Sequence, residues 1–359
     1  MSESLLCYRA GPTAIERLRQ GTLRDQLRVF VGPATGPKWI VLYGLDRALL
    51  ELGILGRAGG PVLAGASAGA WRAVALASPD PAKTHTALLE AYTARSFCRG
   101  ATRGEVSTAY AEILERIFAG TEPFIAGAST HELVIHTARL RTTRPQTPRV
   151  WDAATLGVAA LLSPLAGAAQ RLTLQRVSFC TAGARAVLAG RHGKTVALTA
   201  ENLLPATLAS GTVPMAMRAV HGIPGGRSGA HLDGGLTDYH YADGYTHTDG
   251  VTLLMSHQPR IYERWLDQYA PWRRPRAQLL DRLVHVYPSE AFLARLPGRH
   301  IPSRQDFTRF ADDPESRIAH WRRTADESRA LGDQLVSDLE SGRFLDRVAP
   351  FESNGSRSR

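Results

Sequence analysis

Short apolar runs and longer runs of helical periodicity alternate along most of the chain. The first apolar run, LRVFVG, predicts a strand, and WIVLYGLDRALLEL after it predicts a largely buried helix. A second such pair, PVLAG and AGAWRAVALAS, comes next, and residues 81–119 predict two helices broken near CRGATRGE. Further strands are predicted where β-branched residues gather between polar or Gly/Pro-rich stretches: HELVIHTARL, RVSFCTA, TVALT, VTLLMS and RLVHVYPS.

This alternation predicts an α/β fold with a mainly parallel central sheet covered on both faces. In such sheets, functional groups gather beyond the carboxyl ends of the strands. We expect an N-terminal extension over residues 1–25, a main domain over residues 26–345, and a disordered polar tail over residues 346–359. A helical pattern late in the main domain is expected to close the core: Ile318, Trp321, Ala325, Leu331, Leu335 and Leu339.

With 359 residues, 44% of them hydrophobic, the chain is long enough to bury a large core. Its formal net charge is +10, and all but three of its 43 basic residues are arginine. Codon bias is the simplest explanation, and affinity for polyanions or for an anionic membrane surface is the functional alternative. Because no nucleic-acid-binding motif is recognisable, we expect contact with anionic lipid rather than with nucleic acid.

The three cysteines lack the spacing of metal ligands or of a disulfide framework, which indicates a reducing compartment. The N-terminal stretch has no apolar run of the kind found in signal peptides. We therefore expect a cytoplasmic protein that makes peripheral contact with membranes. Neither a metal site nor a cofactor is expected, and the sequence does not indicate an oligomeric state.

Two further segments bear on access to lipid. Residues 153–170, AATLGVAALLSPLAGAAQ, carry no charge, but Pro164 and the short length argue against a membrane span. A buried helix or helical hairpin is the favoured interpretation, and an apolar lid or interfacial anchor is the alternative. Arg260–Arg282 mixes arginine with tryptophan and tyrosine, which suits a lipid headgroup layer. An ordinary packing helix is the favoured interpretation of that segment.

The turn after PVLAG carries a serine flanked by small residues. Gly65-Ala66-Ser67-Ala68-Gly69 fits G-x-S-x-G, and a strand before it and a helix after it are the context in which this pattern presents a nucleophile. Gly65 and Gly69 would let the strand and the helix approach closely while Ser67 takes a strained backbone conformation. The N–H groups at the start of the helix would then suit an oxyanion. A glycine-rich turn with an idle serine is the alternative.

A serine nucleophile needs a base, and the sequence leaves two kinds open. In a Ser–His–Asp arrangement the base would be a histidine late in the chain, and His257 and His285 are the best placed. The other candidate is the aspartate of Asp233-Gly234-Gly235, which directly follows a short predicted strand. Because Asp-Gly is also a common hairpin signal, an ordinary turn is an equally simple interpretation of this run.

Together with a turn from Ala209 to Pro214 (ASGTVP), these motifs resemble the patatin-like phospholipase family. That family combines a glycine-rich loop after the first strand, G-x-S-x-G after the second, an ASxxxP turn and D-G-G or D-G-A, and all four occur here in order. The resemblance implies a three-layer α/β/α sandwich, with core motifs over residues 29–236 and further strands and helices over residues 250–342. It also implies hydrolysis of lipid acyl esters by a dyad without histidine, in which Ser67 is the nucleophile and Asp233 the general base.

The first loop departs from the family's usual G-G-G-x-R-G. It contains Pro33 and Pro37, which have no N–H to donate. The resemblance leaves Gly36, Lys38 and Ala68 as the expected donors to an oxyanion. Since one missing donor costs about 10²–10³-fold in turnover, a non-catalytic lipid-binding or regulatory protein of the same fold is an alternative hypothesis. A Ser–His–Asp esterase is another.

Overall fold

The computed structural model describes residues 3–141, 173–189, 192–240, 245, 249–270 and 272–351. Over these residues, ten strands form one mixed sheet in the order β10-β1-β9-β8-β2-β3-β4-β5-β6, and β7 pairs with β4 beside this path. Six of the eight pairs along the path are parallel, which confirms an α/β fold with a mainly parallel sheet. The strands are β1 (Leu6–Ala10), β2 (Leu27–Gly32), β3 (Val62–Ala66), β4 (Leu133–Leu140), β5 (Leu174–Cys180), β6 (Lys194–Ala197), β7 (His231–Leu232), β8 (Val251–Met255), β9 (Leu283–Pro288) and β10 (Val348–Pro350).

The middle strands of the sheet are buried on both faces, as their near-continuous apolar runs lead one to expect. In β2, Phe30 belongs to one hydrophobic core, whereas Val29 and Val31 belong to another. In β3, Leu63 and Ala64 divide between the two cores in the same way. This division follows from the alternation of side chains across a strand. Each face of the sheet therefore has a core of its own.

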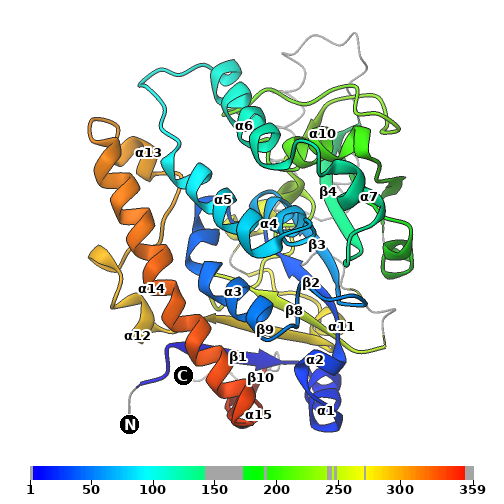
Figure 1. Ribbon diagram of the computed structural model, residues 1–359, viewed down its shortest axis with the longest axis vertical. Coiled ribbons are helices and arrows are strands. Elements are labelled where there is room, and N and C mark those ends of the chain that lie inside the picture. Colours follow the sequence, from blue (N-terminus) through cyan, green and yellow to red (C-terminus); the bar gives the residue numbers. More distant parts are fainter. Residues whose placement is uncertain are drawn as a thin grey trace.

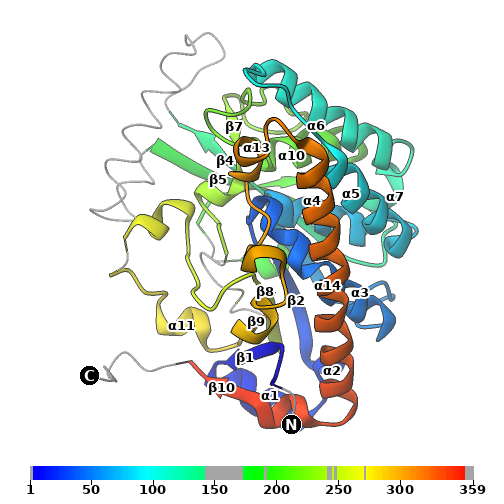
Figure 2. The same ribbon diagram turned by 90° about the vertical axis from the view of Figure 1, so that its left-hand side faces the viewer.

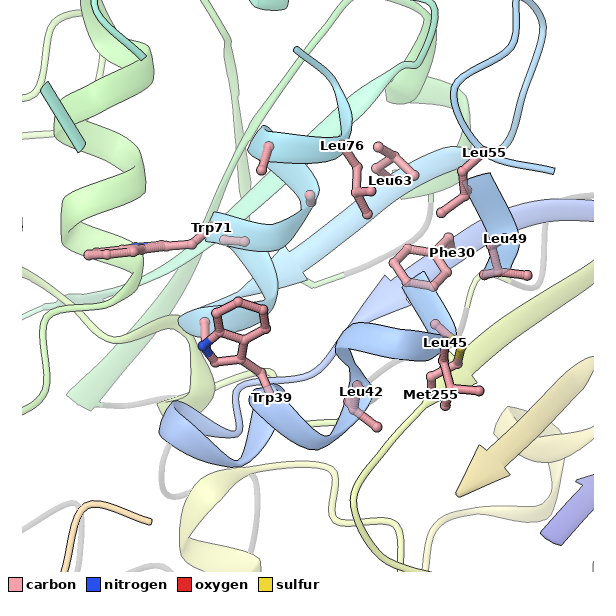
Figure 3. Close-up of a cluster of buried hydrophobic side chains, with 14 of the residues drawn as sticks. Phe30, Trp39, Leu42, Leu45, Leu49, Leu55, Leu63, Trp71, Leu76 and Met255 are labelled. Atoms are coloured by element: carbon pink, nitrogen blue, oxygen red, sulfur yellow. The ribbon is translucent and has the colours of Figure 1, made fainter. Parts of the chain in front are cut away.

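The larger core lies between the sheet and a layer of helices on one face, seen edge-on in Figure 2. Figure 3 shows Phe30 and Leu63 of the sheet packed among Leu45, Leu49 and Leu76 of two helices. The long helix α14 crosses α3, and α10 packs against β4, α6 and α7. The helical segments of this layer are η1 (Gly36–Leu42), α3 (Tyr43–Glu51), α4 (Ala68–Leu76), α5 (Pro81–Ala94), α6 (Arg103–Phe118), α7 (Glu122–Gly127), α10 (Ala200–Ser210) and α14 (Pro314–Glu340).

Short elements contribute to the smaller core on the opposite face. η2 (Gly183–Leu188) supplies Val187 and Leu188, and α11 (Ala277–Leu280) supplies Leu279. The other short helices are α1 (Pro12–Gln20), α2 (Leu23–Gln26), η3 (Gly234–Leu236), η4 (Trp265–Tyr269), α12 (Glu290–Leu293), η5 (Pro297–Arg299), α13 (Asp306–Arg309) and α15 (Arg343–Arg347).

A fully buried charge cluster joins α3, α4 and α5. Arg72 of α4 donates from Nε to Asp46 Oδ2 at 2.8 Å and from Nη2 to Asp46 Oδ1 at 2.6 Å. His85 Nε2 of α5 lies 3.0 Å from Asp46 Oδ2, and all three side chains are 0% exposed. Burial alone would raise the pKa of Asp46, but the Arg72 guanidinium and His85 outweigh it and lower that pKa. An ionised carboxylate is thus held between three helices.

The two ends of the described chain meet in the sheet, near the bottom of Figure 1. β1 pairs antiparallel with β9 and parallel with β10, and the Tyr8 hydroxyl donates to Asp338 Oδ2 of α14 at 2.9 Å. Residues 6–10, expected in an N-terminal extension, are therefore a strand of the sheet. Residues 346–350, expected in a disordered tail, complete α15 and form β10. β1 (LCYRA) is interrupted by an arginine and β10 (VAP) has only three residues, so neither shows the apolar run by which the other strands were predicted.

The prediction of one packing helix over Arg260–Arg282 is wrong. In its described residues this segment contains only the short helices η4 and α11, joined by irregular backbone. Pro275 contributes to this break, because a proline restricts the preceding residue to extended conformations. Tyr269 and Trp272 are 67% and 66% exposed.

The predicted element over residues 153–170 lies outside the described residues. Within the described ranges, no helix has the length and apolar character needed to cross a membrane.

Candidate active site

Ser67 occupies a sharp turn between β3 and α4, at the carboxyl end of a central strand. Its backbone has φ 54° and ψ −131°, a conformation that residues other than glycine rarely adopt. Two glycines permit this turn. A Cβ on Gly69 would lie 1.9 Å from the Gly32 carbonyl oxygen, and a Cβ on Gly65 would lie 2.5 Å from the Gly69 carbonyl carbon. The close approach of β2, β3 and α4 therefore requires glycine at both flanking positions of the motif.

Ser210, the last residue of α10, holds the backbone of this turn in place. The Ser67 N–H donates to Ser210 Oγ at 2.9 Å, and Ser210 Oγ donates to the His136 carbonyl oxygen of β4 at 2.7 Å. One buried hydroxyl thus links the serine turn to the neighbouring strand. The sequence placed Ser210 in the ASxxxP turn but gave no indication of this role.

The pairing of β4 brings Asp233 to Ser67. β5 occupies one edge of β4, while β3 and β7 share the other: β3 pairs as far as His136, and β7 approaches from the opposite direction as far as Ala138. Ser67 follows the end of β3 and Asp233 follows the end of β7, so the two residues meet head to head. Ser67 Oγ donates to Asp233 Oδ2 at 2.8 Å, and the two residues are 3% and 6% exposed.

Gly234 and Gly235 allow Asp233 to approach so closely. A Cβ on Gly234 would lie 2.1 Å from the His136 carbonyl oxygen, and a Cβ on Gly235 would lie 2.7 Å from Ala34 Cβ in the first loop. The Gly235 N–H also donates to Asp233 Oδ1 at 2.8 Å. Both carboxylate oxygens of Asp233 are therefore held, one by the backbone and one by the serine.

The surroundings of Asp233 make its carboxylate a better proton acceptor than that of an exposed aspartate. Burial raises the pKa of Asp233, and the Arg304 charge, the Ser67 hydroxyl and the Gly235 N–H oppose this rise without cancelling it. A carboxylate with a raised pKa is a stronger base than an exposed aspartate. The geometry therefore pairs a strained, buried serine hydroxyl with a strengthened base.

Two of the three expected oxyanion donors border the space beside Ser67. α4 begins at Ala68, whose N–H is among those that the helix leaves unpaired, and Gly36 begins η1 with φ 55°. Both residues line the cavity described below. Lys38 does not: it lies further into η1, where the i→i+3 pattern of a 3₁₀-helix engages its N–H. Burial, with the nearby Arg304 charge, lowers the pKa of Lys38.

A cavity of about 630 Å³ opens beside Ser67 and Ala68. Its walls are mainly aromatic and aliphatic side chains from α4, α5, α6, the segment after α10, and α13. Three arginines are the charged groups among its described lining residues. The side chains that define its character are Trp71, Tyr92, Phe97, Val106, Tyr110, Val213, Met215, Met217, Phe307, Arg99, Arg103 and Arg304.

Arg304 is the charged residue next to the Ser67–Asp233 pair that the sequence analysis missed. Its Nη2 lies 3.6 Å from Asp233 Oδ2, although 71 positions separate the two residues along the chain. Arg304 has no motif around it and is one of 40 arginines. Only the fold could single it out.

The histidines considered as alternative bases do not bond to Ser67. Among the described residues, neither ring nitrogen of His257 finds a partner with hydrogen-bond geometry. His285 Nε2 bonds with Ser256 Oγ at 2.7 Å, and its Nδ1 has no partner in the part of the chain that the structure describes. Burial lowers the pKa of both imidazoles well below the ordinary value. Both histidines are therefore neutral core residues.

Among the described residues, His300, Asp306 and His320 bring three metal-ligand atoms within 4.8 Å of one another, a grouping that the sequence did not suggest. However, the Asp306 oxygens already accept hydrogen bonds from His300 Nε2 at 2.7 Å, the Ser303 N–H at 2.9 Å and Trp321 Nε1 at 2.8 Å. The two imidazoles stack with 23° between their planes. Because the Asp306 oxygens are already used by these hydrogen bonds, the three residues suit a structural hydrogen-bond network better than a metal site.

No protein-family model matches the chain, and no curated protein is significantly similar to it.

Proposed function

We propose that the chain is a serine acyl hydrolase of the patatin-like type, which cleaves carboxylic esters of lipids through an acyl-enzyme on Ser67. The observation that carries this proposal is the hydrogen bond of 2.8 Å from Ser67 Oγ to Asp233 Oδ2, made beside an apolar cavity. Because this bond is direct, the pair suits a Ser–Asp dyad and leaves no place for an intervening imidazole. The three-layer family fold and its lipid-degrading activity are parts of the same proposal.

In the first half-reaction, Ser67 Oγ attacks the ester carbonyl carbon and its proton passes to Asp233 Oδ2. The carbonyl electron pair moves onto the oxygen, which becomes an oxyanion. When the intermediate collapses, the bond to the alcohol breaks and the alcohol takes the proton from Asp233. Water then attacks the acyl-enzyme with Asp233 again as base, which releases the fatty acid and restores Ser67.

The oxyanion would lie at the start of α4, against the Ala68 and Gly36 N–H groups. The Ala68 donor is fixed before the reaction, since α4 is anchored by the glycine contacts and the turn by Ser210. A prearranged site of this kind stabilises charge without reorganising as the charge develops. No metal or cofactor is needed for such chemistry.

The cavity suits an acyl chain because aromatic and aliphatic side chains dominate its walls. Its volume of about 630 Å³ is that of a small-molecule site. We infer that the partner is a lipid or acyl ester rather than nucleic acid. A cytoplasmic protein that meets anionic membranes at their surface would have access to such esters.

Covalent labelling with a fluorophosphonate ester tests this proposal. The probe phosphonylates an activated serine, so we expect one adduct, located on Ser67 by peptide mass spectrometry. His257→Gln and His285→Gln are the controls for a Ser–His–Asp enzyme, and both are expected to label like the wild type. Absence of an adduct on the folded wild type would favour the non-catalytic lipid-binding alternative, which the prolines Pro33 and Pro37 of the first loop support.

Replacing Asp233 with asparagine is expected to lower kcat for a soluble acyl ester by about 10²–10⁴-fold, the usual contribution of a general base. The amide keeps the size of the side chain but cannot accept the serine proton. The matched control is Asp333→Asn, an exposed aspartate of α14 that does not line the cavity. Equal losses in the two variants would contradict the role of Asp233.

The rate of hydrolysis is expected to rise with pH through the pKa of Asp233, because only the carboxylate accepts the proton. Burial raises that pKa above the ordinary value of 3.8. The acid limb of kcat/KM should therefore lie at higher pH than for an exposed aspartate, and it is measured with an ester that does not itself titrate. A limb at the ordinary aspartate value would contradict this expectation.

A further inference from the structure

The guanidinium of Arg304 borders both halves of the site. Its Nη2 lies 3.6 Å from Asp233 Oδ2. On the side of the first loop, its Nε and Nη2 lie 3.2 Å and 3.5 Å from the position that a Cβ on Gly36 would occupy. Arg304 also lines two hollows, the large cavity beside Ser67 and a small one beside Asp233 and Ala34. One cation thus stands between the base and the loop expected to bind the oxyanion.

Within the described residues, Asp233 is the carboxylate that Arg304 reaches as an ion pair. A guanidinium has five N–H donors, and a separation of 3.6 Å is longer than a direct hydrogen bond. The side chain is 44% exposed and lines the large cavity. Arg304 therefore has donors to offer to a group bound beside Ser67.

The segment that carries Arg304 is fixed to the body of the protein. Asp306, which is fully buried, accepts the Ser303 N–H at 2.9 Å and Trp321 Nε1 of α14 at 2.8 Å. The residue before Arg304 is thereby tied to the longest helix. His300 Nε2 adds a third bond to Asp306 at 2.7 Å. The backbone on both sides of Arg304 is therefore anchored, so the side chain starts from a fixed position beside Ser67 and Asp233.

We propose that Arg304 is a further catalytic residue, whose charge stabilises first the Asp233 carboxylate and then the oxyanion of the substrate. This inference rests on the proposed hydrolase function. As Ser67 attacks, its proton neutralises Asp233 while the carbonyl electron pair creates a new negative charge on the substrate oxygen. The negative charge moves from the carboxylate to the oxyanion, and Arg304 lies beside both places. A cation brought in from residue 304 thus compensates for the donors that Pro33 and Pro37 lack.

Arg304→Gln is expected to lower kcat for a short soluble acyl ester by about 10²–10³-fold, the cost of one oxyanion donor, and to change KM far less. Arg304→Lys should recover part of kcat because it restores the charge. The matched control is Arg309→Gln, an exposed arginine of the same segment that does not line the cavity. It removes the same charge and should leave kcat unchanged. Equal kcat in wild type and Arg304→Gln would overturn the inference.

A second measurement separates this inference from the proposed function. The carboxyl carbon of Asp233, observed by ¹³C NMR without substrate, should titrate at higher pH in Arg304→Gln than in the wild type, because the neighbouring cation is gone. If the wild type hydrolyses no ester, the proposed function fails whatever the titration shows. If the wild type is active but neither kcat nor the titration responds to Arg304→Gln, only the role of Arg304 fails.

Discussion

Replacing Ser67 with alanine is expected to lower ester hydrolysis by about 10⁶-fold, to the level that the binding site alone supports. The substitution removes the oxygen that forms the acyl-enzyme, and no neighbouring hydroxyl takes its place, because Ser210 Oγ is engaged with the Ser67 N–H and the His136 carbonyl. The measurement is kcat with a soluble ester, together with loss of the fluorophosphonate adduct.

The fold should survive this substitution. Alanine keeps the backbone N–H that bonds to Ser210 and adds no atoms to the crowded contact between β2 and α4. Ser78→Ala is the matched control, since Ser78 follows α4, is buried and bonds only to the Ala75 carbonyl among the described contacts. It should retain wild-type activity. If Ser67→Ala kept activity within tenfold of the wild type, the proposed Ser67–Asp233 dyad mechanism would be contradicted.

Replacing Arg72 with methionine is expected to lower the free energy of unfolding by about 3–5 kcal/mol, which is the usual cost of leaving one partner of a buried ion pair uncompensated. Arg72 makes two hydrogen bonds to Asp46, and both side chains are fully buried. In the variant only His85 remains beside the carboxylate. Urea unfolding monitored by circular dichroism measures the loss.

Two controls identify the cause of this loss. In the double variant Arg72→Met, Asp46→Leu most of the stability should return, because no buried charge is left. The loss should also shrink at acid pH. The folded state lowers the pKa of Asp46, so the pair stabilises the wild type above the unfolded aspartate pKa of about 3.9 and ceases to do so as pH falls through the lower folded value. A loss that is independent of pH would argue for a packing defect instead.

The serine turn could be predicted from sequence because its determinants are local. A short apolar strand, two glycines and a helical run specify the turn within fifteen residues of one another, and β3 and α4 lie where the pattern placed them. Asp233 was not accessible in the same way. β7 has two residues, too few for periodicity, and the run around Asp233 fits a hairpin equally well. Only the order of four motifs singled it out.

Other parts of the site depend on contacts that no local pattern encodes. Ser210 and Arg304 act through partners that lie 143 and 71 positions away, and each belongs to an abundant residue type. Lys38 was expected among the oxyanion donors from the family resemblance, but it lies within η1 and does not line the cavity. The strand β1 was not predicted, because it is stabilised by pairing with β9 and β10, which lie at the other end of the described chain.

The pairing of β1 with β9 and β10, and the position of Arg304 late in the chain, have a consequence for synthesis. Synthesis from the N-terminus produces Ser67 first and Asp233 later, and Arg304, the helix α14 that anchors its segment and the edge strand β10 follow both. A nascent chain therefore holds Ser67 and Asp233 before the described sheet is complete. Under the proposed function, ester hydrolysis would therefore require the later segments that carry Arg304, α14 and β10 as well as the two residues of the dyad.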